Sequence, residues 1–510
     1  MSGNKTIAKN TIFLYFRMML TMLIALYTSR IVLRELGVDD FGLYAVVGGV
    51  VGMLSFFNNA LSMGTSRFLT FELGIGNFEK LRKTFCTLLN LHIIIAIAIA
   101  ILAETAGLWF VCNKLVIPPE RMNAALWVYH ISILTAVVSM TQVPYNASII
   151  SHEKMQVFAY ASIVEVSLKL GIVFLLQFGN MDKLILYAIL LCLLQVGMAL
   201  FYRFYCISRF KETLYKFIID KNIMKTVSSF SGWNLFSQIS SALNSQGTNI
   251  ITSIFFSPAV VAARVISEQV NMAAMQFIGN FRTAANPQIV KKYAAEDYDG
   301  SKKLLLNSTK FSFYLMFLLG LPIIFLAEPL LQLWLGQVPE YSVIFLQLII
   351  VQSLFAVFDT SFYVALYAKG RLKENAMISP VLIFIRFPIT YSLFKAGYSP
   401  VVLSYAGIVL YALLGLVVRP ILICKIVDYT FRDIMSVFIP CLKVCLFATP
   451  IPLLLNYYLN DSLLDYFLIL ASSTISTLAA VLWLGIDADM RLQIVDFLKS
   501  NIRKRIVGEG

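Results

Sequence analysis

Apolar runs of about twenty residues recur along the whole chain and are separated by short polar breaks. A helix needs roughly 20 apolar residues to cross a bilayer core about 30 Å thick, so each run predicts one membrane-spanning helix. Helices are the only spanning element expected from this pattern. About fourteen are predicted, over residues 10–30, 41–65, 86–110, 124–150, 156–178, 183–205, 229–256, 260–285, 311–334, 341–367, 377–396, 399–424, 438–457 and 464–485.

The composition agrees with an all-α polytopic membrane protein. The chain has 510 residues, 59% of them hydrophobic and 14% charged. Its mean hydropathy of +0.78 is far from that of ordinary soluble domains. No stretch is long and polar enough for a large soluble domain. The start, MSGNKTIAKN, lacks the features of a cleavable signal, so we expect the first helix to be retained.

The cysteines and histidines do not suggest catalytic or metal chemistry. The seven cysteines lie in or beside apolar runs without a CxxC pair, and the three histidines are scattered. Neither a metal site nor a disulfide framework is therefore expected, and no catalytic residue is predicted.

The net charge of +13 has two possible explanations. A basic balance is typical of nucleic-acid-binding proteins, but here the basic residues are spread over many short loops without an aromatic-basic module. Membrane topology explains them better, because most lie in loops that we assign to the cytoplasm, with the richest at 203–225 and 291–310. We therefore expect a multi-pass protein with both termini in the cytoplasm and no nucleic-acid partner.

The two halves of the chain are predicted to be repeats. A shift of 220 residues places the loop at 76–83 on the loop at 296–303, with mostly similar chemistry, and a shift of 218 places Tyr145 on Tyr363. Six predicted helices separate the equivalent positions, so both copies have the same orientation and the pseudo-symmetry axis runs along the membrane normal. Chance similarity between apolar segments is the alternative, which the matching loops disfavour.

The repeat gives the expected domain limits. Two pseudo-symmetric lobes of six helices each are predicted, followed by an extra helix pair that has no counterpart. The C-terminal tail alternates apolar and basic residues, which is typical of an interfacial helix. The limits are 1–206 for the N-lobe, 207–228 for a cytoplasmic linker, 229–424 for the C-lobe, 425–486 for the extra pair and 487–510 for the cytoplasmic tail.

The predicted seventh helix is unusual in its many hydroxyl and amide side chains. At about 100° per residue, most of them fall within one arc of about 120°, while Ser240, Gln246 and Asn249 lie off it. One or two such residues are explained by hydrogen bonds between helices, worth roughly 0.6–2 kcal/mol each, whereas a full stripe predicts contact with a water-filled cavity. The stripe contains Asn234, Ser237, Gln238, Ser241, Asn244, Ser245, Thr248 and Thr252.

Three more predicted helices carry polar stripes, and the repeat places the stripes of the first and seventh helices on equivalent faces. These helices are therefore expected to wall a polar cleft between the two lobes. The further cavity-lining residues are Arg17, Thr21 and Thr28 on the first helix, Asn59 and Ser62 on the second, and Arg264, Glu268, Asn271 and Arg282 on the eighth.

The charges on these stripes predict an anionic ligand. An arginine at the bilayer centre costs about 2.5–3.5 kcal/mol, so Arg17 needs either a binding role or a structural partner. Arg264 either binds substrate or is neutralised by Glu268, four residues along the same helix, and Arg282 either binds substrate or snorkels. Because a planar guanidinium donates two hydrogen bonds to a phosphate at once, these three arginines form the predicted anion site.

Three further charged residues are candidates for ion coupling. Asp359 is expected to pair with Arg386 on the next helix or to bind a coupling ion. Glu165 and Lys169 lie four residues apart and form either a structural pair or part of a coupling path.

Three segments of the chain resemble a known family. They are SRIVLRELGVDDFGLYAVV near the first loop, VPYNASIISHEKM at the end of the fourth helix and AANPQIVKKYAAED at the end of the eighth. They are similar to the polysaccharide-transport branch of the multidrug/oligosaccharidyl-lipid/polysaccharide exporter (MOP) superfamily, and most of all to Wzx-type O-antigen and capsule flippases. The resemblance extends over roughly the first 430 residues. The extra helix pair resembles that of the lipid-linked peptidoglycan-precursor flippases.

This resemblance implies a V-shaped, two-lobed transporter of the bacterial inner membrane, and not an enzyme. Its implied substrate is an undecaprenyl-diphosphate-linked oligosaccharide, moved to the outer leaflet by alternating access for lipopolysaccharide (O-antigen), capsule or exopolysaccharide synthesis. Arg17 and Arg264 match by position the cavity cations of the family. No cofactor is implied beyond H⁺, Na⁺ or the membrane potential, and the implied partners are membrane lipids and a polysaccharide polymerase and glycosyltransferases of the same pathway. The alternatives are a multidrug cation exporter of the same superfamily and a membrane-embedded glycosyltransferase or polymerase.

Overall fold

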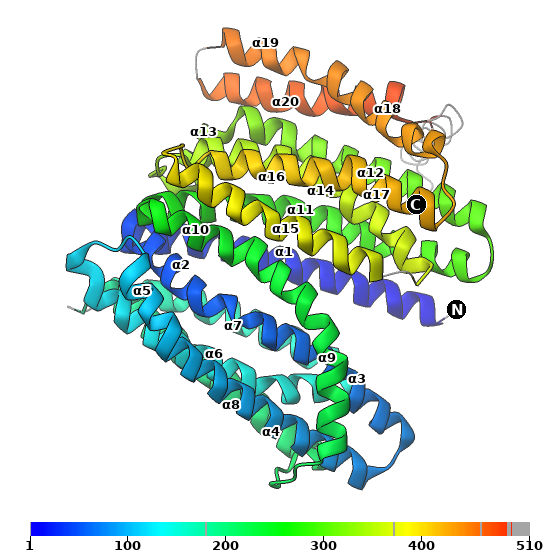
Figure 1. Cartoon of the computed structure of the whole chain (residues 1–510). Helices are drawn as coiled ribbons and strands as arrows, with labels where there is room; N and C mark the ends of the chain where they lie inside the picture. The colour runs from blue at the N-terminus through cyan, green and yellow to red at the C-terminus, as the bar shows by residue number, and fades with distance from the viewer. Residues whose placement is uncertain are drawn as a thin grey trace, which may run out of the picture. The chain divides into compact units, whose positions relative to one another are not determined.

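The structure is a computed structural model that describes residues 2–152, 154–178, 181–370, 373–459, 462–486 and 491. Side chains are described at fewer positions, and those of residues 2–18, 228–237 and 373–377 are outside the description. Every regular element in the described part is a helix (Figure 1). The all-α prediction is therefore confirmed.

In the described part of the chain, ten α-helices precede residue 258, and several continue into one another. Leu54 alone separates the helix Val38–Met53 from the helix Ser55–Ile75, and the π-helical turn Leu243–Gly247 joins the helix that ends at Ala242 to the one that begins at Thr248. The helices are α1 (Ser2–Leu36), α2 (Val38–Met53), α3 (Ser55–Ile75), α4 (Phe78–Leu102), α5 (Leu108–Lys114), α6 (Met122–Ser151), α7 (Met155–Leu175), α8 (Lys183–Arg209), α9 (Lys221–Ala242) and α10 (Thr248–Phe255).

Ten more α-helices follow among the residues that the structure describes. They are α11 (Pro258–Ala294), α12 (Tyr298–Phe325), α13 (Ala327–Leu335), α14 (Ser342–Ala368), α15 (Lys373–Lys395), α16 (Val402–Ala412), α17 (Arg419–Ile426), α18 (Phe431–Ala448), α19 (Pro450–Tyr458) and α20 (Leu463–Ala480).

Each predicted span falls on one of these helices or on a run of consecutive ones. Among the described residues, nine helical segments are long and apolar enough to cross a membrane. The chain is therefore a multi-span membrane protein, while the count of fourteen crossings stays a prediction.

The helices form two compact units that interleave along the sequence. The first unit consists of Met1–Ile266, Pro339–Tyr341 and Ile383–Pro400, and the second of Ser267–Val338, Ser342–Leu382 and Val401–Gly510. α11 and α15 each continue from one unit into the other. α9 and α10 belong to the first unit, whereas the sequence repeat assigns them to the second half. The predicted lobe limits were derived from the sequence repeat and not from contacts, so this division does not test them and they stay a prediction.

The first unit is built around α6, which packs against α2, α3, α4 and α8. Tyr129 of α6 is fully buried, and its hydroxyl donates a hydrogen bond to the carbonyl oxygen of Ala103 across 2.7 Å. Gly107 makes this contact possible, because a Cβ atom there would lie 2.2 Å from the Tyr129 hydroxyl oxygen. A side chain at position 107 would therefore displace the tyrosine from the core.

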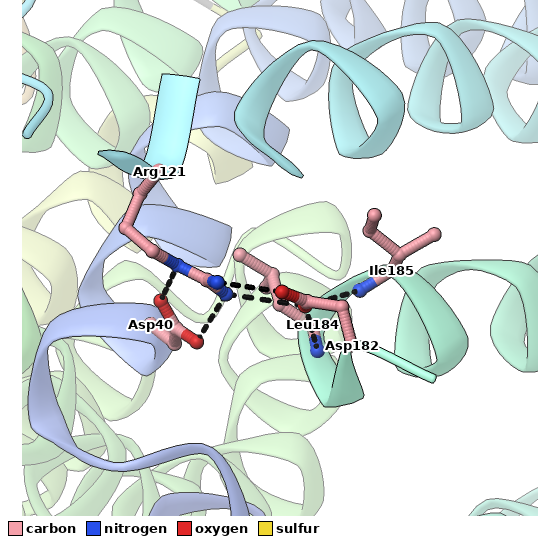
Figure 2. A network of polar contacts seen from close by, with 5 residues as sticks. All are labelled: Asp40, Arg121, Asp182, Leu184 and Ile185. Carbon is pink, nitrogen blue, oxygen red and sulfur yellow. Dashed lines mark hydrogen bonds and ion pairs between the residues drawn. The ribbon is translucent and has the colours of Figure 1, made fainter. Parts of the chain in front are cut away.

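Arg121 ties two other parts of the first unit together (Figure 2). Its guanidinium donates to Asp40 of α2 across 2.8 and 2.5 Å and to Asp182, which precedes α8, across 2.5 and 3.1 Å. Asp182 Oδ1 also accepts the backbone N–H groups of Leu184 and Ile185 and so caps α8. The hydrogen bonds from Arg121 lower the pKa of Asp182.

The segment between α8 and α9 lies along α4 within the first unit. Asn90 of α4 donates from Nδ2 to the carbonyl oxygen of Ile218 across 2.9 Å, and its Oδ1 accepts a hydrogen bond from the Tyr215 hydroxyl across 2.8 Å. Asp220 then caps α9 by accepting the N–H groups of Asn222 and Ile223. Hydrogen bonds therefore fix the predicted linker to α4 of the first unit.

The second unit is built around α12 and α14, which pack against each other. The ring of Phe358 on α14 stacks on Phe313 of α12 with centroids 4.9 Å apart. α18 and α20 also pack against α12, and Tyr314 donates from its hydroxyl to the carbonyl oxygen of Gly485 across 2.7 Å. The predicted extra helix pair thus shares a core with the second unit.

Candidate functional site

Arg264 is held in a tight hairpin between α10 and the start of α11. Its side chain is buried (7% exposed), with Nε donating to Asn249 Oδ1 across 3.2 Å and a terminal nitrogen donating to Thr248 Oγ1 across 3.1 Å. α2 approaches this hairpin closely, because a Cβ atom at Gly42 would lie 1.9 Å from the Pro258 carbonyl oxygen. Both acceptors are uncharged side chains of α10, and these two bonds orient the guanidinium.

A second buried arginine, Arg386 of α15, lies in the same unit. It is 5% exposed and donates to Asn244 Oδ1 across 3.2 Å. Asn244 belongs to the π-helical turn Leu243–Gly247 that joins α9 to α10. Amide and hydroxyl side chains of one helical segment, residues 244–249, therefore hold two arginines.

This π-helical turn corrects the predicted stripe. A π turn contains more residues than an α turn, so the residues after Gly247 are rotated relative to a regular continuation of α9. Asn249, which regular helical geometry places off the stripe, contacts Arg264 together with Thr248. The predicted arc from Asn234 to Thr252 assumed regular α-helical geometry, which this turn interrupts; the cavity-lining role of these residues stays a prediction.

In the second unit, polar residues of α11 contact α14. Asn271 Oδ1 accepts a hydrogen bond from Ser353 across 2.7 Å. Arg282 donates to the hydroxyl of Thr360 across 2.7 Å and also to its carbonyl oxygen. Hydrogen bonding between helices was the alternative to a cavity-lining role, and these contacts favour that alternative for Asn271.

The expected pairing of Asp359 with Arg386 was wrong. Asp359 accepts a hydrogen bond from Arg419 Nε across 2.5 Å, with the two side chains 11% and 5% exposed. The Arg419 guanidinium also lies over the ring of Tyr363, 5.7 Å from its centroid. Arg419 is sixty residues from Asp359 in the sequence, and only the packing of α14 against α17 brings the two together.

Glu165 and Lys169 form the ion pair expected from their spacing. Lys169 Nζ lies 2.7 Å from Glu165 Oε1, and both side chains of α7 are partly exposed, at 42% and 30%. This geometry is that of an ordinary pair on one helix surface. Their coupling role stays a prediction.

The side chains of the remaining predicted cavity residues are described for some positions and not for others. Thr21, Thr28, Ser62, Gln238 and Glu268 are half-buried, and Ser245 is exposed. The Thr28 hydroxyl is buried and has no hydrogen-bond partner in the described part of the chain. The side chains of Arg17, Asn59, Asn234 and Ser241 lie outside the described residues.

Comparisons with known proteins identify the family. A sequence model described as polysaccharide biosynthesis protein matches residues 7–292, which is more than half of the chain, and a MatE model matches residues 234–392. A search of curated protein sequences found no significant match.

Solved structures with similar folds are membrane transporters. A lipid II flippase MurJ in its inward closed conformation has a TM-score of 0.71 and 12% identity, covering 92% of this chain and 97% of that one. An inward-facing multidrug resistance MATE transporter of the MOP superfamily has a TM-score of 0.68 and 14% identity, covering 82% of this chain and 99% of that one. A MOP superfamily transporter from Pyrococcus furiosus, with a TM-score of 0.52 and 15% identity, covers 93% of both chains. The chain therefore belongs to the polysaccharide biosynthesis protein family, the polysaccharide-transport branch of the MOP superfamily.

Proposed function

We propose that the protein is a flippase for undecaprenyl-diphosphate-linked oligosaccharides in the bacterial inner membrane. It moves the glycan and diphosphate from the cytoplasmic to the outer leaflet by alternating access, while the lipid chain remains in the bilayer. The observation that carries the proposal is the pair of buried arginines, Arg264 and Arg386, oriented by the uncharged side chains of residues 244–249. Guanidinium groups bind diphosphates well, because each donates two hydrogen bonds at once.

An apolar groove on the same helices suits the lipid part of this substrate. The groove has a volume of about 300 Å³ and is lined by residues next to those that bind the arginines, including Gly247, Ile250, Phe387 and Tyr391. Gly247 precedes Thr248, and Phe387 follows Arg386. The helices of the first unit thus offer contacts to a ligand that is anionic at one end and apolar at the other.

The second candidate function is export of cationic drugs, which the MatE match at residues 234–392 supports. A cation exporter requires acidic residues at its binding site. Asp359, which was predicted to pair with an arginine or to bind a coupling ion, is paired with Arg419 in the second unit. The described clusters are richer in arginine than in carboxylates, which favours an anionic substrate.

The membrane potential is the simplest energy source for this transport. An inside-negative potential favours outward movement of an anionic headgroup by roughly 2.3 kcal/mol per charge per 100 mV. Additional coupling to protons or sodium ions is tested by the dependence of transport on imposed ion gradients.

The function is tested with purified protein in liposomes. A fluorescent undecaprenyl-diphosphate oligosaccharide is incorporated, and its appearance in the other leaflet is followed with a membrane-impermeant quencher, beside uptake of a rhodamine-type cation. We expect lipid flipping well above that of protein-free liposomes, no cation uptake and an unchanged mass of the glycolipid. Cation uptake without flipping would instead identify a drug exporter, and a changed glycolipid mass would identify an enzyme.

A further inference from the structure

Two aromatic–arginine pairs occupy equivalent places in the two units. Tyr145 of α6 lies under the guanidinium of Arg203 of α8, 6.0 Å from ring centroid to Cζ. Tyr363 of α14 lies under Arg419 of α17 in the same way, at 5.7 Å. The sequence repeat relates Tyr145 to Tyr363, and Arg203 stands 216 residues before Arg419. The structural similarity of the two pairs supports their equivalence.

The two pairs differ in how the arginine is neutralised. Asp359, one helical turn before Tyr363, accepts a hydrogen bond from Arg419. The residue one turn before Tyr145 is Thr141, which carries no charge. Within the described part of the chain, Arg203 forms no ion pair, and its side chain is exposed. The first unit therefore presents a cation at the place where the second unit contains its own carboxylate.

Arg203 lines a pocket of about 330 Å³ between α4, α6 and α8. The polar lining residues are Thr141, Gln142, Tyr145, Arg203 and Tyr215. Tyr145 is 3% exposed, and its hydroxyl has no hydrogen-bond partner among the described residues. A buried hydroxyl without a partner costs free energy, so a ligand that accepts a hydrogen bond from it is favoured.

The rest of the pocket is apolar, with Leu89, Ile93, Val138, Val196 and Leu200 among its lining residues. On the same helix as Arg203, the side chains of Leu193 and Phe204 are 61% and 75% exposed. In a multi-span protein, such a surface faces lipid. Free phosphate would use only the polar part of the pocket, whereas a phospholipid uses both parts.

We propose that this pocket binds an anionic phospholipid, independently of the transported substrate. The headgroup phosphate accepts hydrogen bonds from Arg203 and from the Tyr145 hydroxyl and takes the place that the Asp359 carboxylate has beside Arg419. One acyl chain lies along the aliphatic residues of α4, α6 and α8. By the predicted topology, the site lies near the cytoplasmic surface of the membrane, where anionic lipids attract basic residues.

The proposal is tested on the purified full-length protein, delipidated in detergent. Dioleoyl-phosphatidylglycerol or dioleoyl-phosphatidylcholine is titrated in, and bound lipid is measured by native mass spectrometry. We expect the anionic lipid to bind preferentially, and Arg203→Gln to weaken its binding about tenfold, as for loss of one charge-assisted contact. Thr141→Asp, which introduces the carboxylate of the second unit, should weaken it similarly. Arg209→Gln, in the same helix but outside the pocket, is the matched control and should bind as the wild type does.

Melting temperatures show whether each variant is folded. If Thr141→Asp does not fold, Arg203→Lys, which keeps the charge, should retain most of the binding that Arg203→Gln loses. Equal binding of the two lipids, or undiminished binding by Arg203→Gln, would overturn the proposal. Displacement of the lipid by millimolar inorganic phosphate would also overturn it, because the site would then belong to a free anion.

Discussion

Arg419 donates a hydrogen bond to Asp359 across 2.5 Å in the core of the second unit, with both side chains buried. Removing one partner of a buried ion pair leaves the other charge in a poorly solvated place. If Asp359 serves to stabilise the fold, its substitution should lower the free energy of unfolding. If Asp359 instead binds a coupling ion, its substitution should change transport.

The variant Asp359→Asn should lower the free energy of unfolding by about 3–5 kcal/mol, as is usual when a buried pair is broken. The measurement is the thermal unfolding of the purified protein in detergent. The double variant Asp359→Asn with Arg419→Gln should regain part of the lost free energy of unfolding, because neither position then carries a buried charge. An Asp359→Asn protein that melts like the wild type but loses dependence on a proton or sodium gradient would favour the coupling role instead.

The ion pairs of Arg121 predict a pH-dependent stability. Since Arg121 lowers the pKa of Asp182, the unfolded state binds a proton more readily than the folded state does, and stability is lost as pH falls. We expect Arg121→Gln to lower the free energy of unfolding by about 1–3 kcal/mol at neutral pH.

The difference in melting temperature between wild type and Arg121→Gln is measured from pH 7 to pH 3. It should shrink as the pH falls and the two carboxylate partners of Arg121, Asp40 and Asp182, become protonated; Asp182, whose pKa Arg121 lowers, gives up its share only below the ordinary aspartate pKa of about 3.9. A difference that is unchanged at pH 3 would contradict the role given to Asp182.

Glu165→Gln should leave both stability and ion dependence nearly unchanged. Its pair with Lys169 is partly exposed, and such i,i+4 pairs contribute about 0.3–0.5 kcal/mol. Transport in liposomes with and without a pH gradient tests the point. Loss of the gradient dependence in this variant would give Glu165 the coupling role that its geometry does not suggest.

Arg264→Lys tests whether charge alone suffices at the proposed anion site. An ammonium group keeps the charge but cannot reproduce the fork with which Arg264 donates to both Asn249 and Thr248. We expect flipping rates between those of the wild type and Arg264→Ala. Wild-type rates for the lysine variant would show that orientation by α10 does not matter.

The helices could be predicted from the sequence because bilayer thickness sets the length of each apolar run. The contacts between polar side chains of different helices could not be predicted in this way. Asp359 is close in sequence to Arg386, but the packing of α14 against α17 selects Arg419 instead. Asn249 contacts Arg264 although the pattern places it off the stripe, and a pattern of polar residues does not reveal the π turn at Leu243–Gly247. The repeat related Tyr145 to Tyr363, but the arginine that lies over each ring, Arg203 or Arg419, could be found only in the structure.

The central claim is that arginines of this chain bind the diphosphate of a lipid-linked oligosaccharide during its translocation. Its most direct test is the flipping rate of the labelled glycolipid in liposomes that contain wild type, Arg17→Ala or Arg264→Ala, at equal protein content. The account predicts that Arg264→Ala and Arg17→Ala each lower the rate about tenfold or more, as expected for a lost charge-assisted hydrogen bond. Undiminished flipping by both variants would contradict it.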